Sequence, residues 1–309
     1  MANSRRRPPP DAGVGRPVAI GYSAAMVRFL SGVVALLLVA APAAARDILF
    51  IGNSFTFGAG SPVEHYRPAS VTDLNRDGIG GVPALFRSFA EQAGLDWTVS
   101  LETSPGKDLA FHYANKRAPI DRRWDVVILQ GYSTLDADKP GDATRHGIAA
   151  GQLAALVRAR NPGAQVKLVE TWSRADLTYR PGSRWSGKPI ATMAQDLAAA
   201  NRRVARTTPG ISGTIPVGSA WNRAIATGVA DANPYDGIDP GKLGLWAEDH
   251  YHGSTAGYYL EALTVFGRVT GYDVRRLGAK ERSAADLGLT GNQAVALQRI
   301  AWETLRRNR

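Results

Sequence analysis

Short apolar runs recur along the chain, each followed by small or polar residues. The clearest run, 48–51, leads directly into Gly52, Asn53 and Ser54. A continuous apolar run of this length, bounded by glycine, is typical of a strand buried on both faces in a parallel sheet. Similar runs rich in apolar and β-branched residues predict four more strands, at residues 97–103, 125–130, 165–172 and 214–218.

Segments with a helical pattern separate and follow these strands. Segment 83–93 has proline in its first turn and Gly94 after its end, which are typical helix boundaries. The other predicted helices lie at residues 108–117, 147–160, 189–206, 255–269 and 292–306. This alternation predicts an α/β fold with a doubly wound, parallel, five-stranded sheet and helices on both faces. The strand count fits the flavodoxin-like order.

Residues 1–45 are predicted to be a signal peptide, and residues 46–309 a single domain. Arg28 precedes an apolar stretch that ends in the small residues 43–45, a typical cleavage site. Because this stretch is short for a membrane span, we expect an exported protein, periplasmic or extracellular, without stable membrane insertion. An uncleaved anchor is the alternative. Met26 could itself be the start, which would make residues 1–25 an upstream misassignment of the start codon.

Composition excludes several kinds of chemistry. The chain has 309 residues, 44% of them hydrophobic, which suffices for one large α/β domain. It has no cysteine, which rules out disulfides, thiol nucleophiles and cysteine metal sites. The net charge is +10, of which +4 lies in residues 1–45. The remaining basic residues are scattered without interleaved aromatics, so we expect no nucleic-acid partner.

Ser54 is the first candidate for catalysis. It follows the first predicted strand, at the edge of an open α/β sheet where ligands bind. A serine at a strand-to-helix turn can present its hydroxyl to a cleft. The alternative is that Ser54 only caps the next helix, because serine is a favoured N-cap residue.

A second candidate segment, 246–254, contains two of the five histidines and lies between a loop and a predicted helix. Asp249 precedes His252 by three residues, so one turn can bring both side chains to the same side. Asp249 could then accept from one ring nitrogen of His252 while the other nitrogen faces Ser54, as serine hydrolysis requires.

Metal binding is the alternative for two segments. Asp249, His250 and His252 could hold zinc, although no further ligand follows at a suggestive spacing. Residues 73–78 have the D-x-N-x-D-G start of a calcium loop, but the twelfth position is Ala84, which has no carboxylate. An ordered loop with Asx turns is the simpler interpretation of that segment. We therefore predict no metal site.

Taken together, these motifs resemble those of the SGNH (GDSL-like) hydrolases, which are esterases, lipases and carbohydrate deacetylases on a flavodoxin-like sheet. Residues 52–56 are similar to the first family block, with Asn53 where aspartate is usual, and Gly106 is similar to the second-block glycine. Residues 129–133 stand where the third block, G-x-N-D, is expected, and residues 249–252 match the D-x-x-H block.

The resemblance implies specific roles. Ser54 would be the nucleophile, His252 the base and Asp249 its orienting acid, with His250 outside the triad. The backbone N–H groups of Ser54 and Gly106 would serve the oxyanion hole.

The third block has no asparagine for the remaining oxyanion donor. Some carbohydrate-esterase branches carry Q-G-x-S there, so we expect the Gln130 side chain to replace it, with Ser133 as the alternative. Removing one such donor costs about 2.7–4 kcal/mol of transition-state stabilisation.

The predicted activity is that of a secreted serine esterase that hydrolyses short-chain esters, acetyl esters first, on a small molecule or a glycan. An acyl-enzyme would form on Ser54 and be hydrolysed by water, without a cofactor. Asn53, Trp172 and Trp185 are predicted to contact substrate, and the two tryptophans, with Tyr179, could stack on a sugar. Ordinary core packing is the alternative for these aromatic residues.

Two other functions remain open. One is a glycan-binding or accessory protein that keeps the fold without efficient turnover. The other is an arylesterase, thioesterase or lysophospholipase, although no long apolar lid segment is present for long acyl chains.

Overall fold

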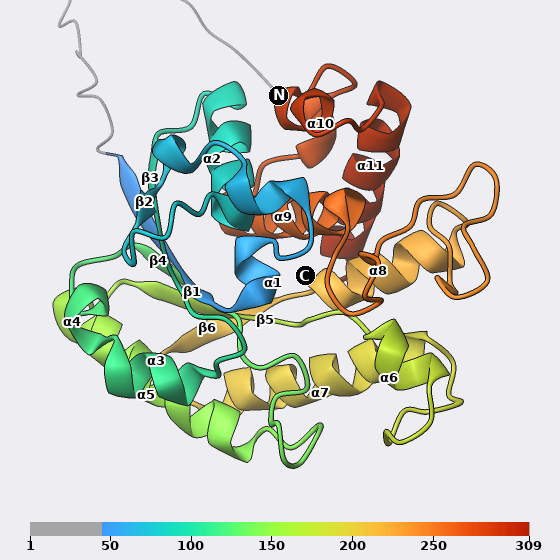
Figure 1. Cartoon of the computed structure of the whole chain (residues 1–309). Coiled ribbons are helices and arrows are strands. Elements are labelled where there is room, and N and C mark those ends of the chain that lie inside the picture. Colours follow the sequence, from blue (N-terminus) through green and yellow to red (C-terminus); the bar gives the residue numbers. More distant parts are fainter. Residues whose placement is uncertain (1–44, 309) are drawn as a thin grey trace, which may run out of the picture. The chain divides into compact units, whose positions relative to one another are not determined.

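The computed structural model describes residues 45–308 (Figure 1). The predicted signal peptide lies outside the described residues, except for its last residue. In the described part, no helix is both long and apolar enough to span a bilayer.

Within residues 45–308 a single parallel sheet of six strands forms the centre of the fold, in the order β2-β3-β1-β4-β5-β6. The strands are β1 (Arg46–Gly52), β2 (Thr72–Asp73), β3 (Trp97–Thr103), β4 (Val126–Leu129), β5 (Gln165–Val169) and β6 (Ile211–Ile215).

The α-helices of this part are α1 (Ser54–Phe57), α2 (Gly81–Gln92), α3 (Leu109–Asn115), α4 (Arg117–Ile120), α5 (Thr144–Arg160), α6 (Ala175–Tyr179), α7 (Ala191–Thr207), α8 (Val217–Ala226), α9 (Thr255–Thr270), α10 (Arg282–Asp286) and α11 (Gly291–Arg307). Its 3-10 helices are η1 (Pro62–His65), η2 (Pro68–Ser70) and η3 (Val274–Leu277).

The predicted α/β fold is confirmed, with one correction to the strand count. The sixth strand is β2, a two-residue edge strand within the loop predicted to lack regular structure. Its pairing with β3 gives it strand geometry although its residues carry no strand pattern. Without β2, the other five strands follow the flavodoxin-like order 2-1-3-4-5 when they are numbered along the chain.

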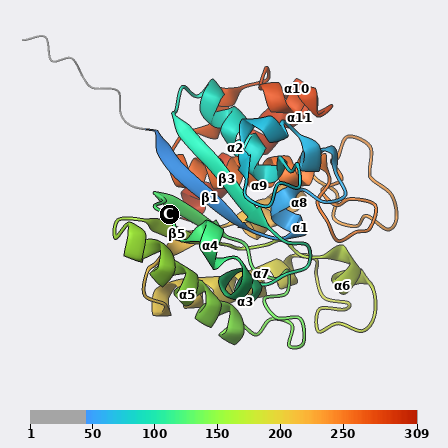
Figure 2. The same ribbon diagram turned by 60° about the vertical axis from the view of Figure 1, so that its left-hand side comes forward.

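Helix layers cover both faces of the sheet, so β1 is buried on both sides. Ile48 and Phe50 belong to the core shared with α2, α8, α9 and α11. Leu49 and Ile51 point to the other core, under α3 and α5. Figures 1 and 2 show these two layers from different directions, with α2 and α9 on one face and α3 and α5 on the other.

Several predicted boundaries needed correction. The predicted fourth strand, 165–172, ends at Val169, although the following residues stay buried. The predicted fifth strand, 214–218, is shifted: β6 ends at Ile215 and Val217 already begins α8. The β5–α7 connection contains the short helix α6, in a segment where the sequence predicts neither a strand nor a helix.

The loop before α2 is ordered by Asx-type hydrogen bonds, as predicted. The Asp73 carboxylate accepts from the backbone N–H groups of Asn75, Asp77 and Ile79 at 2.8–3.2 Å. These bonds occupy the carboxylate that would have begun a calcium loop.

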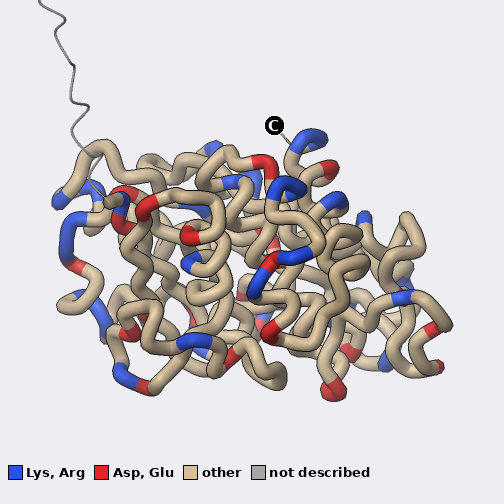
Figure 3. Tube along the Cα trace, turned by 90° about the horizontal axis from the view of Figure 1, so that it is seen from above, with Lys and Arg blue, Asp and Glu red and all other residues tan. Residues whose placement is uncertain are grey.

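Charged residues of both signs are interspersed along the chain. Figure 3 shows Lys and Arg mixed with Asp and Glu over the described trace, without a continuous basic stripe in that view.

His146 on α5 is a buried histidine whose ring packs against the backbone of the β4–α5 loop. A Cβ added at Gly131 would lie 2.4 Å from its Nδ1, and its Nε2 lies 3.0 Å from Oδ1 of Asn201 on α7. The Asn201 amide nitrogen donates to Leu197, so Oδ1 is left to accept from Nε2. Burial lowers the pKa of His146 from 6.5 to about 4, against the opposing effects of Asn201 and Asp108.

This shift predicts acid sensitivity. Because the folded-state pKa is depressed, the stability that neutral His146 contributes is present above pH 6.5 and is lost as the pH falls toward 4. We expect the free energy of unfolding to drop by about 2 kcal/mol between pH 7 and pH 5 from this group. Denaturant unfolding of the parent and of His146→Gln at pH 7 and pH 5 measures this difference in the free energy of unfolding. Equal pH dependence in the two proteins would contradict the assignment.

Candidate active site

Ser54 lies at the turn between β1 and α1, at the carboxyl edge of the sheet. Asn53, not Ser54, is the N-cap of α1: its side-chain oxygen accepts from the Phe55 N–H at 3.2 Å. Ser54 is the first residue of the helix and is 7% exposed. In residues 45–308 its hydroxyl has no hydrogen-bond partner. The capping alternative for Ser54 is therefore wrong.

The Asn53 amide ties three strand ends together. Its nitrogen donates to the carbonyl of Lys107, after β3, at 2.9 Å and to that of Gly131, after β4, at 3.1 Å. β1 lies between β3 and β4 in the sheet, so Asn53 joins the loops on both sides of the strand that carries Ser54. Because the nitrogen and oxygen are both engaged, the substrate contact predicted for Asn53 finds no support in the structure.

Gln130 holds the same turn from the β4 side. Its side-chain oxygen accepts from the Asn53 N–H and from the Thr56 hydroxyl, each at 3.0 Å. The Asn53 N–H can only donate, so this atom must be the oxygen and the amide orientation is fixed. The amide nitrogen donates to the Gly131 carbonyl. A positioning role for Gln130 thus has direct support, whereas the predicted oxyanion role remains a prediction.

Gly52 shows how tightly this turn is packed. A Cβ there would lie 2.1 Å from the Thr56 hydroxyl oxygen and 2.8 Å from the Gln130 side-chain oxygen. Any side chain at residue 52 would therefore displace the bonds that shape the nucleophile turn.

The two backbone N–H groups that the resemblance assigns to an oxyanion hole are those of Ser54 and Gly106. Gly106 lies in the β3–α3 turn with φ +68°, and the turn is closed by the Lys107 N–H donating to Ser104 at 3.2 Å. Within the described residues, the N–H groups of Gly106 and Ser54 have no protein acceptor. This arrangement suits the roles that the resemblance implies for them.

Asp249 and His252 form the pair that their spacing predicts. Asp249 Oδ2 and His252 Nδ1 are 2.6 Å apart, while Oδ1 accepts from the backbone N–H groups of Tyr251 and His252 at 3.0 and 2.9 Å. Burial would raise the pKa of Asp249, but the hydrogen bonds from the ring and the backbone outweigh it and hold the pKa below its usual value. Asp249 is therefore ionised at neutral pH and fixes the orientation of the imidazole.

The other ring nitrogen of His252 has a different environment. Nε2 is buried and has no hydrogen-bond partner in the part of the chain that the structure describes. The ring stands edge-on to that of Phe55, the residue after Ser54, with centroids 5.8 Å apart. The Tyr258 hydroxyl, on the helix that follows His252, lies 3.0 Å from the Ala59 carbonyl and 3.3 Å from the Ser54 carbonyl, which are its two acceptors. The His252 ring therefore lies beside the helix that begins with Ser54.

His250 is separate from this pair. It has a positive φ of 58°, and its ring packs on Tyr235 with centroids 4.1 Å apart. Among residues 45–308, no three His, Asp or Glu side chains cluster closely enough to hold a metal ion. The zinc alternative gains no support, because Asp249 is engaged by the imidazole of His252.

The two tryptophans predicted to contact substrate are core residues. Trp172 is fully buried and stacks between Phe55 and Trp221. The distances between ring centroids are 3.9 Å to Phe55 and 4.6 Å to Trp221. Trp185 is also fully buried, and its indole N–H donates to Asp196 at 2.8 Å. The substrate role predicted for both is wrong, since neither offers an exposed face. Trp172 instead supports the helix that carries Ser54.

Arg174 is a site residue that no motif predicted. Its guanidinium pairs with Asp176 at 2.6 Å, donates to the Ser133 hydroxyl at 3.2 Å and lies 3.7 Å from the centroid of the Tyr251 ring. The Tyr251 ring in turn lies 4.1 Å from that of His252. Arg174 therefore links the β4–α5 loop to the loop of the Asp–His pair. Ser133, the alternative oxyanion donor, is buried and bonded to Arg174.

The fold is shared with a solved structure of a DUF4886 family protein from Bacteroides uniformis ATCC 8492. The TM-score is 0.60 at 19% sequence identity, over 85% of this chain and 96% of that chain. The matches also include a candidate SGNH hydrolase from Slackia heliotrinireducens (TM-score 0.46, 22% identity, 73% and 99% of the two chains). A candidate GDSL-like lipase from Parabacteroides merdae ATCC 43184 is another (TM-score 0.48, 16% identity, 73% and 95%).

At these identities the likeness concerns the fold, and the activity has to be argued from the site. No protein-family model matches the chain, and no curated protein matches it significantly.

The positioning role of Gln130 leads to a prediction. In Gln130→Leu the buried Asn53 N–H loses its acceptor, so we expect unfolding to become easier by about 1–3 kcal/mol and labelling of Ser54 by a fluorophosphonate to slow. Thr56→Val is the control, because it removes the other donor but leaves the Asn53 N–H paired. Denaturant unfolding and the labelling rate measure both effects. A large loss of labelling at unchanged stability would instead support the oxyanion role.

Proposed function

We propose that this protein is a serine hydrolase that cleaves carboxylic esters with short acyl groups. The observation that carries the proposal is the Asp249–His252 pair, whose free Nε2 lies buried beside the helix that begins with Ser54. A carboxylate-oriented imidazole and a serine at a strand-to-helix turn are the parts that acyl transfer requires.

The proposed reaction passes through an acyl-enzyme. Nε2 of His252 takes the hydroxyl proton of Ser54 while the serine oxygen attacks the ester carbonyl carbon. The oxyanion that forms accepts from the N–H groups of Ser54 and Gly106. His252 then returns the proton to the departing alcohol. Water, deprotonated by the same histidine, hydrolyses the acyl-enzyme, and the acid leaves as Ser54 regains its proton.

Asp249 contributes by stabilising the protonated imidazole. Its carboxylate accepts from Nδ1 and is fixed by two backbone N–H groups, so it holds the ring in one tautomer through both half-reactions. The lowered pKa of Asp249 keeps this negative charge present throughout the neutral range.

Short acyl groups on a polar alcohol, such as acetyl esters of carbohydrates, are the substrates we propose. Large apolar side chains exposed on the described part are few: Ile148, Tyr179, Ile238 and Val295. A long-chain lipid would need a continuous apolar surface, so a lysophospholipase is less favoured than an esterase for small acyl groups.

One observation favours the alternative of a glycan-binding protein with little turnover. The Gln130 amide oxygen accepts from Asn53 and its nitrogen donates to the Gly131 carbonyl, so part of the amide is already engaged within the turn before Ser54. The rate of ester hydrolysis by the intact protein distinguishes an esterase from a glycan-binding protein with little turnover.

Export is also part of the proposal. The apolar stretch before Ala43-Ala44-Ala45 supports it. The mature chain is then expected to begin at Arg46, which N-terminal sequencing of the protein recovered outside the cytoplasm would check. A full-length chain in the cytoplasmic fraction would refute it.

The triad predicts the behaviour of three variants in p-nitrophenyl acetate hydrolysis. Ser54→Ala and His252→Asn should lose activity, and Asp249→Asn should lower kcat by about 10⁴, because the imidazole loses its orientation and its counter-charge. His250→Asn is the matched control: asparagine tolerates its positive φ, and activity should persist.

A fluorophosphonate probe gives the second readout. It should label the parent at Ser54, as located by mass spectrometry, and should not label Ser54→Ala. A folded parent with neither activity nor labelling would refute the esterase and leave the glycan-binding function as the better account.

A further inference from the structure

A groove runs from the site along the face of α5. It consists of two adjoining cavities, of about 260 Å³ and about 410 Å³, which share Asp136, Asp138 and Arg145 as lining residues. The smaller cavity reaches Gly106 and Tyr132, and the larger extends to Gln152. We call the two together the α5 groove.

The inner end of the α5 groove is bonded directly to the nucleophile turn. The Lys107 carbonyl, in its wall, accepts from the Asn53 amide at 2.9 Å. The Gly131 carbonyl, just before the lining residue Tyr132, accepts from the same amide at 3.1 Å. A molecule in the groove would therefore lie against the loops that flank Ser54.

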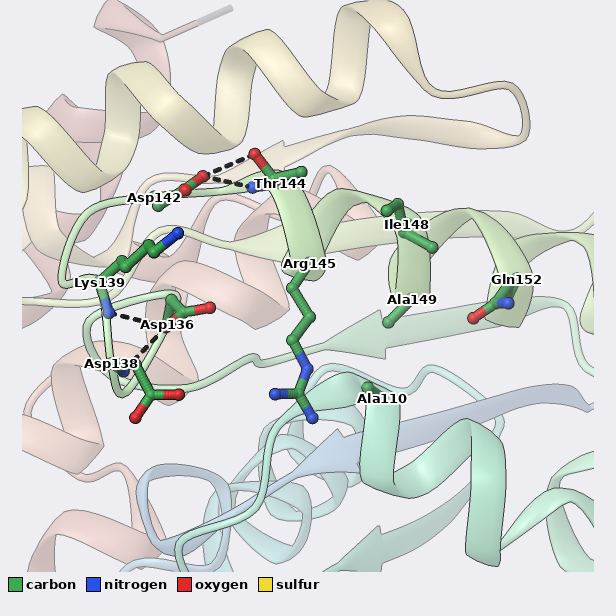
Figure 4. A pocket seen from close by; sticks show the side chains of 10 residues that line it. All are labelled: Ala110, Asp136, Asp138, Lys139, Asp142, Thr144, Arg145, Ile148, Ala149 and Gln152. Atoms are coloured by element: carbon green, nitrogen blue, oxygen red, sulfur yellow. Dashed lines mark hydrogen bonds between the residues drawn. The ribbon is translucent and has the colours of Figure 1, made fainter.

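The lining is polar and carries both charges. The carboxylates in it are Asp108, Asp136, Asp138 and Asp142, and the cations are Lys107, Lys139 and Arg145. Figure 4 shows Arg145 extending from α5 toward Ala110, with Asp138 on one side and Ile148 and Gln152 farther along the helix.

Several of these groups are held in place before any ligand binds. Asp136 accepts from the N–H groups of Asp138 and Lys139 at 2.8 Å, and Arg145 pairs with Asp108 at 3.3 Å. The two bonds of Asp136 order residues 136–139, so this part of the groove has a defined shape before a ligand binds, which lowers the ordering cost of binding. The partly exposed rings of Phe111 and Tyr132 in the inner cavity add flat apolar faces.

We propose that the α5 groove binds the neutral oligosaccharide part of an esterified substrate, which rests on the proposed esterase function. Sugars offer hydroxyl groups to charged and amide side chains, and apolar ring faces to aromatic ones. Carboxylates outnumber cations in the groove, which disfavours an anionic polymer. Its apolar contacts are isolated, which disfavours a lipid chain.

Gln152→Trp tests the outer end of the groove, because a large ring at this exposed position would fill the larger cavity. Val295→Trp on exposed α11 is the matched control. Binding of neutral xylo-oligosaccharides, from monosaccharide to hexasaccharide, is measured by calorimetry on the Ser54→Ala protein with each variant. We expect affinity that rises with length and falls about tenfold in Gln152→Trp but not in Val295→Trp.

Kinetics give the second arm. For the active protein, Gln152→Trp should lower kcat/KM for acetylated xylo-oligosaccharides about tenfold and leave p-nitrophenyl acetate hydrolysis unchanged. Asp138→Ala, which removes an exposed acceptor, should also lower kcat/KM for acetylated xylo-oligosaccharides.

The outcomes separate the two proposals. If the parent does not hydrolyse p-nitrophenyl acetate, the esterase fails, and binding to the Ser54→Ala protein still decides the groove. If xylo-oligosaccharides do not bind, or bind Gln152→Trp as tightly as the control, the groove proposal is wrong. Tighter binding of oligogalacturonate or of a lysophospholipid would also overturn it.

Discussion

The hydrogen bonds of Asn53 are the constraint on which the rest of the site depends. One buried amide caps α1 and joins the loops after β3 and β4 on either side of β1. Parallel strands bring their carboxyl ends to one edge of the sheet, but their loops remain separate segments until something connects them. Asn53 makes this connection one residue before Ser54, so Ser54, the Gly106 turn and the inner end of the α5 groove are held by the same hydrogen bonds.

A second set of contacts holds the Asp249–His252 loop against this scaffold. Trp172 donates to the Tyr251 carbonyl at 3.2 Å, Trp246 donates to the Ser173 carbonyl at 2.9 Å, and Arg174 lies over the Tyr251 ring. The segment after β5 thus supports the loop that carries His252, although it contains no group that the proposed reaction uses. A substitution at Arg174 would remove the contact that holds the Tyr251 ring and would thereby shift His252. It would not remove a contact with substrate.

Sequence predicted the parts of this molecule that follow from local pattern. The continuous apolar run of β1 is read correctly because alternate residues really do enter two different cores. The Asp249–His252 pair follows from a spacing of three residues within one turn. β2 escaped prediction because two residues carry no periodicity, and β6 was displaced because Val217 begins a helix where its β-branched neighbours favour a strand.

The errors in the site concern residues whose surroundings come from distant parts of the chain. Trp172 and Trp185 lie in or beside a predicted loop after a strand, where an exposed ring could stack on a sugar. Tertiary packing instead places both side chains in the core. The oxyanion role of Gln130 comes from the resemblance to a family block and remains a prediction, whereas its positioning role could not be read from the sequence because its partners Asn53 and Thr56 lie more than 70 positions away. Arg174 is found only when the loops after β4 and β5 are seen together.

The most direct test of the account is a crystal structure of the protein after reaction with a small alkyl fluorophosphonate. We predict phosphorus bonded to the Ser54 oxygen, with Nε2 of His252 within hydrogen-bond distance of that oxygen. The phosphoryl oxygen should accept from the N–H groups of Ser54 and Gly106 while Gln130 still holds Asn53. An adduct on another residue, or a Ser54 adduct with His252 turned away, would contradict the central claim that Asp249 and His252 activate Ser54.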